Sequence, residues 1–436
     1  MKDTGHYLNY EGRKIFFSLP PDWRLISGED RSPPRVVADV EAEVKRALDN
    51  PFGSLPIEKI AKPGMEAVLL FDDQQRATPA HLTLPRVMNR LNTAGVTDDS
   101  ISAICANGTH PAPTDEQLKA KVGPEALSRL RGRVFRHDAR SPENIIIGRT
   151  HRGNIVEVNK RVALADLVIG IGACLAHPTS GYSGGYKIIM PGASSYRSVA
   201  EHHFAFLRHK DTSISTLDGN PFWEEIVDAG RLSRLAFKID FVMNERGEVI
   251  RAFAGEPEAE QREAAKLVES LYAVELPGLA DITVTSAFPL EIGVQSTKAL
   301  AIATTCTKPG GVIVWVASQK QAGSILPLVE EMARPLTANE FHQAFVKGLI
   351  PEHLTAFGIS YIMQIVKFKE FSERYRIIHV TEGLTDDQVK MMGMTPSADL
   401  QSTIDRLGQE IVSADVAVFP SGGSLIPRVR STNSLT

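Results

Sequence analysis

The chain has 436 residues, of which 43% are hydrophobic and 23% are charged, and its formal net charge is -4. This length exceeds that of one ordinary domain, so we expect two or three domains, each with its own core. The nearly balanced charge gives no electrostatic reason to expect a nucleic acid or an anionic membrane as a partner. No apolar run is long enough to cross a bilayer, and the first residues lack the apolar part of a signal peptide, so we expect a cytoplasmic protein.

Three cysteines, Cys105, Cys174 and Cys306, lie far apart along the chain, each in or beside an apolar segment. Their spacing matches neither a disulfide framework nor a CxxC metal site. We therefore expect buried, reduced thiols at all three positions.

The predicted elements begin with a hairpin of strands 7–10 and 14–17, followed by a helix over 35–47. Apolar, β-branched runs and amphipathic stretches then alternate along the chain. The runs predict strands at 67–71, 101–106, 167–171, 281–286, 312–316, 377–380 and 416–419, and the amphipathic stretches predict helices that include 114–122, 258–271 and 297–304. This alternation is typical of the α/β class, with mainly parallel, Rossmann-like sheets that carry helices on their faces.

A domain boundary is predicted near residues 275–278, where one helix ends and a new series of strands begins. We expect an N-terminal α/β domain over 1–276, a C-terminal α/β domain over 277–420, and an active-site cleft between them. The remaining residues, 421–436, are rich in Gly, Ser and Pro, and we expect them to form a flexible tail.

Chemically reactive side chains follow four of the predicted strands. In open α/β sheets, ligands bind at the carboxyl ends of the parallel strands, where such loops converge. An active site therefore explains these positions better than scattered surface charges do. In chain order the candidates are Asp73 and Arg76, then His110, then His177 with the glycine-rich segment after it, and finally Gln295 and Lys298.

The glycine-rich segment contains Ser183-Gly184-Gly185, with Lys187 two residues further on. Glycines before a helix allow backbone N–H groups to approach an anion closely, and the lysine adds positive charge at the same place. The segment does not match the GxxxxGK[ST] phosphate loop. By pattern alone, a tight turn with a solvated lysine fits as well as an anion site does.

Four histidines and one lysine are further candidates for the site. His110 and His177 stand in loops directly after strands, where a functional role is favoured over packing. His202 and His203 are neighbours on a predicted helix, so their side chains point about 100° apart and at most one should face a site. Lys298 lies near the start of a helix, where an anionic ligand would compensate its charge, although a solvated lysine fits equally well.

Together these residues resemble the nickel-pincer nucleotide lactate racemases and their 2-hydroxy-acid epimerase relatives. The resemblance rests on the order Asp-x-x-Arg, Gly-x-His, His-x5-Ser-Gly-Gly-x-Lys-x3-Pro-Gly, His and Gln-x-x-Lys. The central block is specific, whereas the two outer pairs gain weight from their order and spacing. The matching residues are Asp73, Arg76, Gly108, His110, His177, Ser183, Gly184, Gly185, Lys187, Pro191, Gly192, His203, Gln295 and Lys298.

The resemblance implies a nickel cofactor, pyridinium-3,5-bisthiocarboxylic acid mononucleotide, joined covalently to Lys187. It implies that His203 completes the nickel coordination, with His202 as the second choice, and a soft ligand set with one imidazole suits nickel. The enzymes that synthesise this cofactor would be partners of the chain. The sequence does not determine the oligomeric state, and a homodimer is one of the options. Beside the cofactor would lie Ser183, Gly184, Gly185 and Asp73.

The resemblance also implies a reaction. Hydride leaves C2 of a small 2-hydroxy acid, a planar 2-keto acid forms, and hydride returns to the opposite face. His110 and His177 would act as the acid and the base. Arg76, Gln295 and Lys298 would bind the substrate, with the planar guanidinium suited to bidentate pairing with a carboxylate.

Departures from the family pattern leave the substrate open. Many relatives have Asp-x-Thr-Arg-Pro where this chain has Gln75 and Ala77 around the arginine, and Pro178 follows the second candidate histidine. Lactate, malate, an aromatic hydroxy acid and a sugar acid are all compatible with the sequence. Phe357 and Tyr361 are the candidates for an aromatic ring near the pyridinium.

Three other functions fit the sequence less well. An NAD-dependent 2-hydroxy-acid dehydrogenase is disfavoured because no GxGxxG motif follows an early strand. A non-enzymatic carboxylate-binding protein would not need two histidines at strand ends. A zinc hydrolase that uses His110, His177 and His203 would have suitable ligand types, but the chain has no HExxH spacing.

Overall fold

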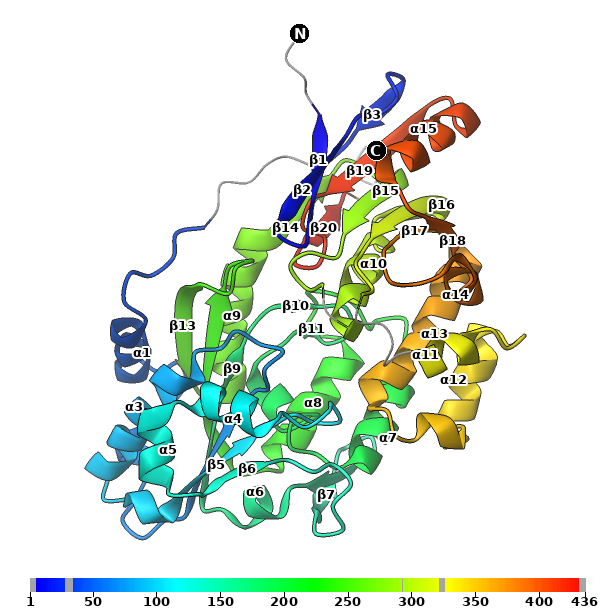
Figure 1. Ribbon diagram of the computed structural model, residues 1–436. Helices are drawn as coiled ribbons and strands as arrows, with labels where there is room; N and C mark the ends of the chain where they lie inside the picture. Colours follow the sequence, from blue (N-terminus) through cyan, green and yellow to red (C-terminus); the bar gives the residue numbers. More distant parts are fainter. Residues whose placement is uncertain (1–4, 28–33, 292, 321–325, 431–436) are drawn as a thin grey trace, which may run out of the picture. The chain divides into compact units, whose positions relative to one another are not determined.

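The structure, a computed structural model, describes residues 5–27, 34–291, 293–320 and 326–430 (Figure 1). Contacts between Cα atoms divide the chain into two compact units, of which residues 33–271 form the first and residues 1–32 with 272–436 form the second. Helices and mainly parallel sheets confirm the predicted α/β class. All three cysteines are free and buried, as expected. Within the described ranges, no helix is both long enough and apolar enough to cross a membrane.

The first unit is built on a six-stranded sheet with the order β13-β12-β9-β4-β5-β6. Neighbouring strands are parallel except at the edge, where β13 runs antiparallel to β12. The strands predicted at 67–71, 101–106 and 167–171 are confirmed, because strands buried on both faces consist of continuous apolar runs. The strands are β4 (Ala67–Phe71), β5 (Ile101–Cys105), β6 (Val134–Arg136), β9 (Leu167–Ala173), β12 (Leu235–Met243) and β13 (Val249–Gly255).

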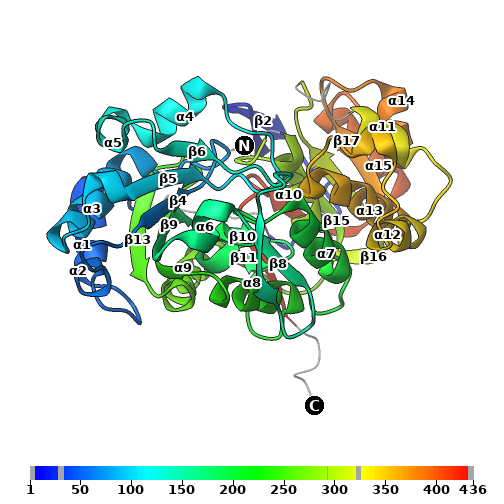
Figure 2. The same cartoon turned by 90° about the horizontal axis from the view of Figure 1, so that it is seen from below.

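Helices cover both faces of this sheet (Figure 2). Apolar residues of α1 to α5 pack with one face of the sheet into a single core. The short helix η2 packs against β9 and β12, and α8 packs against η2. Two small hairpins join β7 (Ile145–Arg149) to β8 (Ile155–Val158) and β10 (Ala176–His177) to β11 (Gly181–Tyr182). The helices are α1 (Val40–Asp49), α2 (Ile57–Ile60), α3 (Ala80–Thr93), η1 (Asp98–Ser100), α4 (Asp115–Val122), α5 (Pro124–Leu130), α6 (Lys160–Leu164), η2 (Gly185–Ile188), α7 (Tyr196–Phe206), α8 (Pro221–Arg231) and α9 (Pro257–Tyr272).

The helix predicted over 35–47 begins later in the structure. Asp39 is the N-cap of α1, and its carboxylate accepts the backbone N–H groups of Glu41 and Ala42. A side chain that satisfies these N–H groups fixes the start of a helix, and the residues before it are excluded from the helix. The predicted start at residue 35 was therefore wrong, whereas the amphipathic stretch after Asp39 is helical.

The second unit contains a six-stranded, fully parallel sheet with the order β18-β17-β16-β15-β19-β3. Alternate residues of its strands pack with the N-terminal hairpin and α15 into one core. The strands are β1 (His6–Tyr10), β2 (Arg13–Phe17), β3 (Trp23–Leu25), β14 (Ala273–Leu276), β15 (Ala280–Ser286), β16 (Thr307–Val316), β17 (Arg376–Val380), β18 (Thr395–Ser397), β19 (Ala414–Phe419) and β20 (Ile426–Val429). The helices are η3 (Gly293–Ser296), α10 (Thr297–Ala303), α11 (Leu326–Met332), α12 (Ala338–Val346), η5 (Glu352–Leu354), α13 (Ile359–Arg374), α14 (Asp386–Met391) and α15 (Leu400–Glu410).

Two segments lie elsewhere than the sequence suggested. The first domain was expected to start at residue 1, but the predicted and observed hairpin β1–β2 and the strand β3 group with the second unit. The reason is that β3 pairs with β19 as the edge strand of the second sheet. The tail expected from residue 421 is ordered as far as residue 430, because β20 pairs with β14 and buries Ile426 completely. Residues 431–436 lie outside the described part of the chain.

Candidate active site

The strand order of the first sheet reverses between β4 and β9. From β4 the chain continues to β5 and β6 on one side, and later to β9 and β12 on the other. Ligands of open α/β sheets bind at the carboxyl ends of the strands beside such a reversal. The loop after β4 carries Asp73 and Arg76, the loop after β5 carries His110, and the segment after β9 carries His177 and Lys187. The first unit thus gathers five predicted site residues at the place where this fold class binds ligands.

Asp73 and His110 form a hydrogen-bonded pair. Asp73 Oδ2 lies 2.7 Å from His110 Nδ1, and the carboxylate also accepts the Gln75 N–H at 3.0 Å. Burial opposes the charge on Asp73, but the hydrogen bond and charge of His110 outweigh it and hold the Asp73 pKa below its ordinary value. Because an ionised carboxylate can only accept, His110 carries a proton on Nδ1, and in the neutral ring Nε2 is an acceptor. This arrangement is that of an oriented general base.

His177 has the opposite arrangement. Its Nδ1 faces the backbone N–H groups of Thr179 at 3.4 Å and of Ser180 at 3.3 Å, inside the tight β10–β11 hairpin. Because N–H groups can only donate, Nδ1 is the acceptor, and the neutral ring carries its proton on Nε2. One candidate histidine therefore presents a lone pair at Nε2 and the other presents an N–H group. The first ring can accept a proton as it stands, whereas the second must take up a further proton before it can act as a general acid.

The amine of Lys187 is held within the protein. Its Nζ donates to Ser180 Oγ at 2.8 Å. Burial, and secondly the positive charge of Arg76, lower the Lys187 pKa from 10.5 to about 7. A substantial fraction of the amine is therefore neutral near pH 7, which is the form that reacts as a nucleophile.

This pKa leads to a direct expectation. In competitive labelling with an acylating reagent, modification of Lys187 should have its midpoint near pH 7, because the pKa is lowered to about 7. Arg76→Gln should move the midpoint upward, since the guanidinium is the second cause of the lowered pKa. Peptide mass spectrometry against pH measures both, with the exposed Lys45 as the internal reference. A midpoint close to 10.5 in the unmodified chain would mean that the amine is hydrated.

The two neighbouring histidines of α7 form a relay. His202 Nε2 lies 2.9 Å from the Phe222 carbonyl oxygen, and the two Nδ1 atoms of His202 and His203 are 3.0 Å apart. Burial lowers the His202 pKa to about 4, so its ring is neutral and donates from Nε2 to the carbonyl. His202 Nδ1 must then accept, and His203 Nδ1 donates to it, which leaves the lone pair of His203 on Nε2. A neutral imidazole whose other nitrogen is fixed by a hydrogen bond is the usual form of a histidine metal ligand.

The environment of His203 connects it with the other candidates. Burial is the main cause that holds the His203 pKa well below its ordinary value. Repulsion from the protonated forms of His202, Lys187 and His110 adds to it, and a hydrogen bond to the Val199 backbone opposes it. A ring kept neutral in this way stays available to a metal at neutral pH. The predicted preference for His203 over His202 stays a prediction, and the hydrogen-bond relay supports it.

The Ser183-Gly184-Gly185 turn is tied to the interior of the first unit. Ser183 Oγ accepts the Leu175 N–H at 2.9 Å, and the Gly185 N–H donates to a carboxylate oxygen of Asp240 at 2.6 Å. The φ angles of 89° at Gly184 and 52° at Gly185 are in the region that favours glycine. Because the Gly185 N–H already bonds an internal carboxylate, any contact of the turn with a cofactor must use other groups. Such a contact stays a prediction.

Gln295 and Lys298 belong to the second unit. They lie in η3 and at the start of α10, after β15, as the sequence predicts. Lys298 is buried and Gln295 is half-buried. Of the candidate aromatic residues, Phe357 directly precedes the N-cap of α13 and Tyr361 lies in its first turn, with ring centroids 6.3 Å apart. The roles of all four remain predictions.

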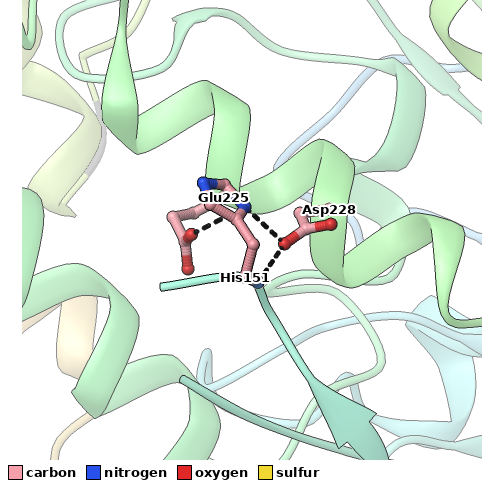
Figure 3. A group of neighbouring side chains, drawn as sticks. All are labelled: His151, Glu225 and Asp228. Atoms are coloured by element: carbon pink, nitrogen blue, oxygen red, sulfur yellow. Dashed lines mark hydrogen bonds and ion pairs between the residues drawn. The ribbon is translucent and has the colours of Figure 1, made fainter. Parts of the chain in front are cut away.

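A second group of potential metal ligands, His151, Glu225 and Asp228, lies in the first unit (Figure 3). Asp228 Oδ2 already accepts both the backbone N–H and the Nδ1 of His151, at 2.6 and 2.7 Å. Glu225, which is fully buried, accepts from Arg152 at 3.3 Å and from Asn154. These bonds explain the group as an ion-paired cluster that ties the β7–β8 turn to α8. The same helix provides the Phe222 carbonyl that fixes His202.

Sequence reasoning missed three contributors to the site. Ser180 holds the lysine amine, Phe222 orients the histidine relay through its carbonyl, and Asp240 anchors the glycine turn. A backbone carbonyl leaves no signal in the residue type. Asp240 does have one, because an acidic residue in the apolar run 235–243 is unusual for a central strand.

Comparisons with known proteins identify the family of this chain. The lactate racemase N-terminal domain matches residues 10–215, and the lactate racemase C-terminal domain matches residues 277–427. The chain is 27% identical to the lactate racemase of Thermoanaerobacterium thermosaccharolyticum, over 96% of this chain and 98% of that protein. It is 28% identical to the lactate racemase of Lactiplantibacillus plantarum, over 88% of this chain and 90% of that protein.

Solved structures show the same relationship. The lactate racemase apoprotein of T. thermosaccharolyticum superposes with a TM-score of 0.83 at 26% identity, covering 97% of this chain and all of that one. A Thermotoga maritima protein with 18% identity and a TM-score of 0.64 shares the fold. Because the two domain families together match well over half of its residues, the chain belongs to the lactate racemase family.

Proposed function

We propose that this protein interconverts the enantiomers of lactate or of a closely related 2-hydroxy acid. The family places it among the racemases, which are isomerases. The observation that carries the proposal is the pair His110 and His177, which hold their protons on opposite ring nitrogens and lie in the segments that follow β5 and β9. Inversion of a carbinol carbon needs one group to take the hydroxyl proton and another to return it.

The residues present fit the cofactor that the family resemblance implies. Lys187 offers a desolvated amine with a pKa of about 7, which suits a covalent tether. His203 offers a neutral Nε2 lone pair whose direction is fixed through His202, which suits nickel. When bound, the nickel-pincer nucleotide would supply a reversible hydride acceptor for C2 of the substrate.

The side chains of this protein would handle the protons and the carboxylate. His110 Nε2 accepts the hydroxyl proton of one enantiomer, and the Asp73 carboxylate stabilises the imidazolium that results. Inversion of C2 would lead through a planar 2-keto acid, and His177 as an imidazolium would then return a proton to the oxygen from Nε2. Its other proton, on Nδ1, can be donated to Thr179 Oγ1, 3.2 Å away. Proton exchange with water would restore both rings. For the opposite enantiomer the roles would be exchanged, with His110 starting as the imidazolium and neutral His177 holding its proton on Nδ1, so that its Nε2 can accept. Arg76 would pair with the substrate carboxylate, with Gln295 and Lys298 as further contacts.

The test is an assay for loss of optical purity. The chain is coexpressed with the cofactor-synthesis enzymes and offered single enantiomers of lactate, malate, an aromatic 2-hydroxy acid and a sugar acid. We expect one of these to racemise without added NAD, and we expect protein from a host that lacks the synthesis enzymes to be inactive. Oxidation that requires NAD would instead support the dehydrogenase, and binding without turnover would support a carboxylate-binding protein.

A separate prediction concerns nickel. His203→Ala should remove most of the bound nickel and the activity while the mass adduct on the chain persists, because it deletes the proposed ligand but not the tether. His202→Phe should weaken nickel binding by about 10- to 100-fold, the typical effect of losing a residue that orients a metal ligand. Nickel content per chain and intact mass measure the two effects. Full nickel content in His203→Ala, with loss in His202→Phe, would reverse the assignment.

A further inference from the structure

A buried set of charged residues lies directly beneath the turn that precedes Lys187. Lys238 and Asp240, both on β12, are 1% and 0% exposed and form an ion pair. The lysine also donates to the Ile239 carbonyl at 3.1 Å. The second carboxylate oxygen of Asp240 accepts the Gly185 N–H at 2.6 Å. This is the one polar contact from the pair to the turn among the described residues.

The neighbouring strand is shaped to accept this pair. A Cβ atom on Gly170 would lie 2.6 Å from Lys238 Cδ, and one on Gly172 would lie 2.9 Å from Lys238 Nζ. Both glycines belong to β9, the strand between β12 and β4. Because these two successive residues on one face of β9 have no side chain, the strand leaves room for the buried side chain of Lys238.

Glu260 on α9 completes the set. It is fully buried, and its carboxyl group lies within hydrogen-bonding reach of the Asp240 carboxylate. Burial first, and the charge of Asp240 second, raise the Glu260 pKa well above its ordinary value, so this carboxyl keeps its proton. Lys238, Asp240 and a neutral Glu260 together carry no net charge, which is the state that a desolvated interior favours.

The turn is held at both ends. Asp240 bonds the Gly185 N–H, and Gln261 Nε2 donates to the Ser183 carbonyl at 3.0 Å. The backbone N–H of Lys187 in turn donates to the Gly184 carbonyl at 3.1 Å. A continuous series of hydrogen bonds therefore runs from the buried carboxylate to the backbone of the cofactor lysine.

We propose that Asp240 is a positioning residue for Lys187: its carboxylate fixes the Gly184–Gly185 turn, and the turn fixes where the lysine amine stands. The relevance to catalysis rests on the proposed role of Lys187 as the cofactor tether. The positioning itself is a property of the chain alone. Stability gives a weak reason for burying an ion pair here, because apolar residues of similar volume commonly stabilise as well or better.

The test compares two double variants of the chain without cofactor. Lys238→Met with Asp240→Asn removes both charges but keeps a carbonyl oxygen that can accept the Gly185 N–H. Lys238→Met with Asp240→Leu removes both charges and the acceptor. Neither variant leaves an unpaired buried charge, so both should fold. The readouts are the pH midpoint of Lys187 acylation and the amide hydrogen exchange of residues 184–187.

We expect the asparagine variant to keep the labelling midpoint of the unmodified chain. In the leucine variant the midpoint should rise by at least one pH unit, a tenfold change in the acid constant, and the amides of the turn should exchange at least tenfold faster. Equal midpoints and equal exchange in the two folded variants would overturn the proposal. Should the leucine variant fail to fold, Asp240→Ala in the same Lys238→Met background replaces it. Because no step uses cofactor or substrate, the result is independent of the racemase assignment.

Discussion

Replacing Lys187 with alanine is expected to reduce racemisation to background. The amine of this residue is the proposed covalent attachment point, and its lowered pKa of about 7 makes it unusual among lysines. Without the tether, the hydride acceptor is absent, so the loss should be complete rather than partial. The measurements are the racemisation rate and the intact mass of protein coexpressed with the synthesis enzymes, in which the adduct should disappear.

Two comparisons sharpen this experiment. Lys187→Arg keeps a positive charge, but a guanidinium does not form the same tether, so it should be as inactive as the alanine variant. Lys45→Ala, which changes an exposed lysine of α1 in an ion pair with Asp49, should retain full activity and the full adduct. Substantial activity in Lys187→Ala would exclude this residue as the attachment point.

The second large effect is expected from the two histidines. His110→Asn and His177→Asn should each lower kcat by about 10^2- to 10^4-fold, the usual contribution of a positioned acid or base. Nickel content and the mass adduct should stay unchanged, because neither ring is the proposed nickel ligand or the tether. Initial rates from each enantiomer, measured separately, give the result.

The partners of the two rings predict a difference between them. Asp73→Asn should impair His110 alone, because Asp73 bonds Nδ1 of that ring, whereas the Nδ1 of His177 is bonded to backbone N–H groups. We expect its effect to approach that of His110→Asn and to leave the hydrogen bonds of His177 unchanged. If each histidine variant kept activity within a few-fold of the unmodified protein, proton transfer would have to use other groups.

Much of the fold could be predicted because the strands are buried on both faces. Residues 67–71 form one uninterrupted apolar strand, and 167–171 form another. Helix α4 was also expected at its observed place, where Thr114 and Gln117 form a capping box. Local sequence determines such elements, so their predicted bounds agree with the observed bounds to within a few residues.

Features that depend on distant pairing could not be predicted in the same way. Strand β3 has three residues and finds its partner β19 almost 400 positions later, so no local pattern assigns it to the second unit. β20 is ordered because it pairs with β14, although its surroundings are rich in Gly and Ser. Composition alone predicts disorder there, and burial of Ile426 outweighs it.

The same distinction, between what the local sequence predicts and what only the fold shows, applies to the candidate site. The residue types and their order were sufficient to select His110, His177, Lys187 and His203. The protonation of each ring follows from its hydrogen-bond partner, which is a carboxylate, a pair of backbone N–H groups or another histidine. Only the partner of His110 comes from a distant segment. The partners of His177 and His203 are near in sequence, but the backbone geometry that brings them into contact appears only in the folded chain.

The fate of the hydrogen at C2 tests the central claim most directly. One enantiomer of the active 2-hydroxy acid, carrying deuterium at C2, is racemised by cofactor-loaded protein in ordinary water, and the product of opposite configuration is analysed by mass spectrometry. If the hydrogen leaves and returns as hydride, with His110 and His177 moving only the hydroxyl proton, the product retains deuterium. A product that carries hydrogen from water at C2 would show that the carbon is deprotonated by a base, which would contradict this account.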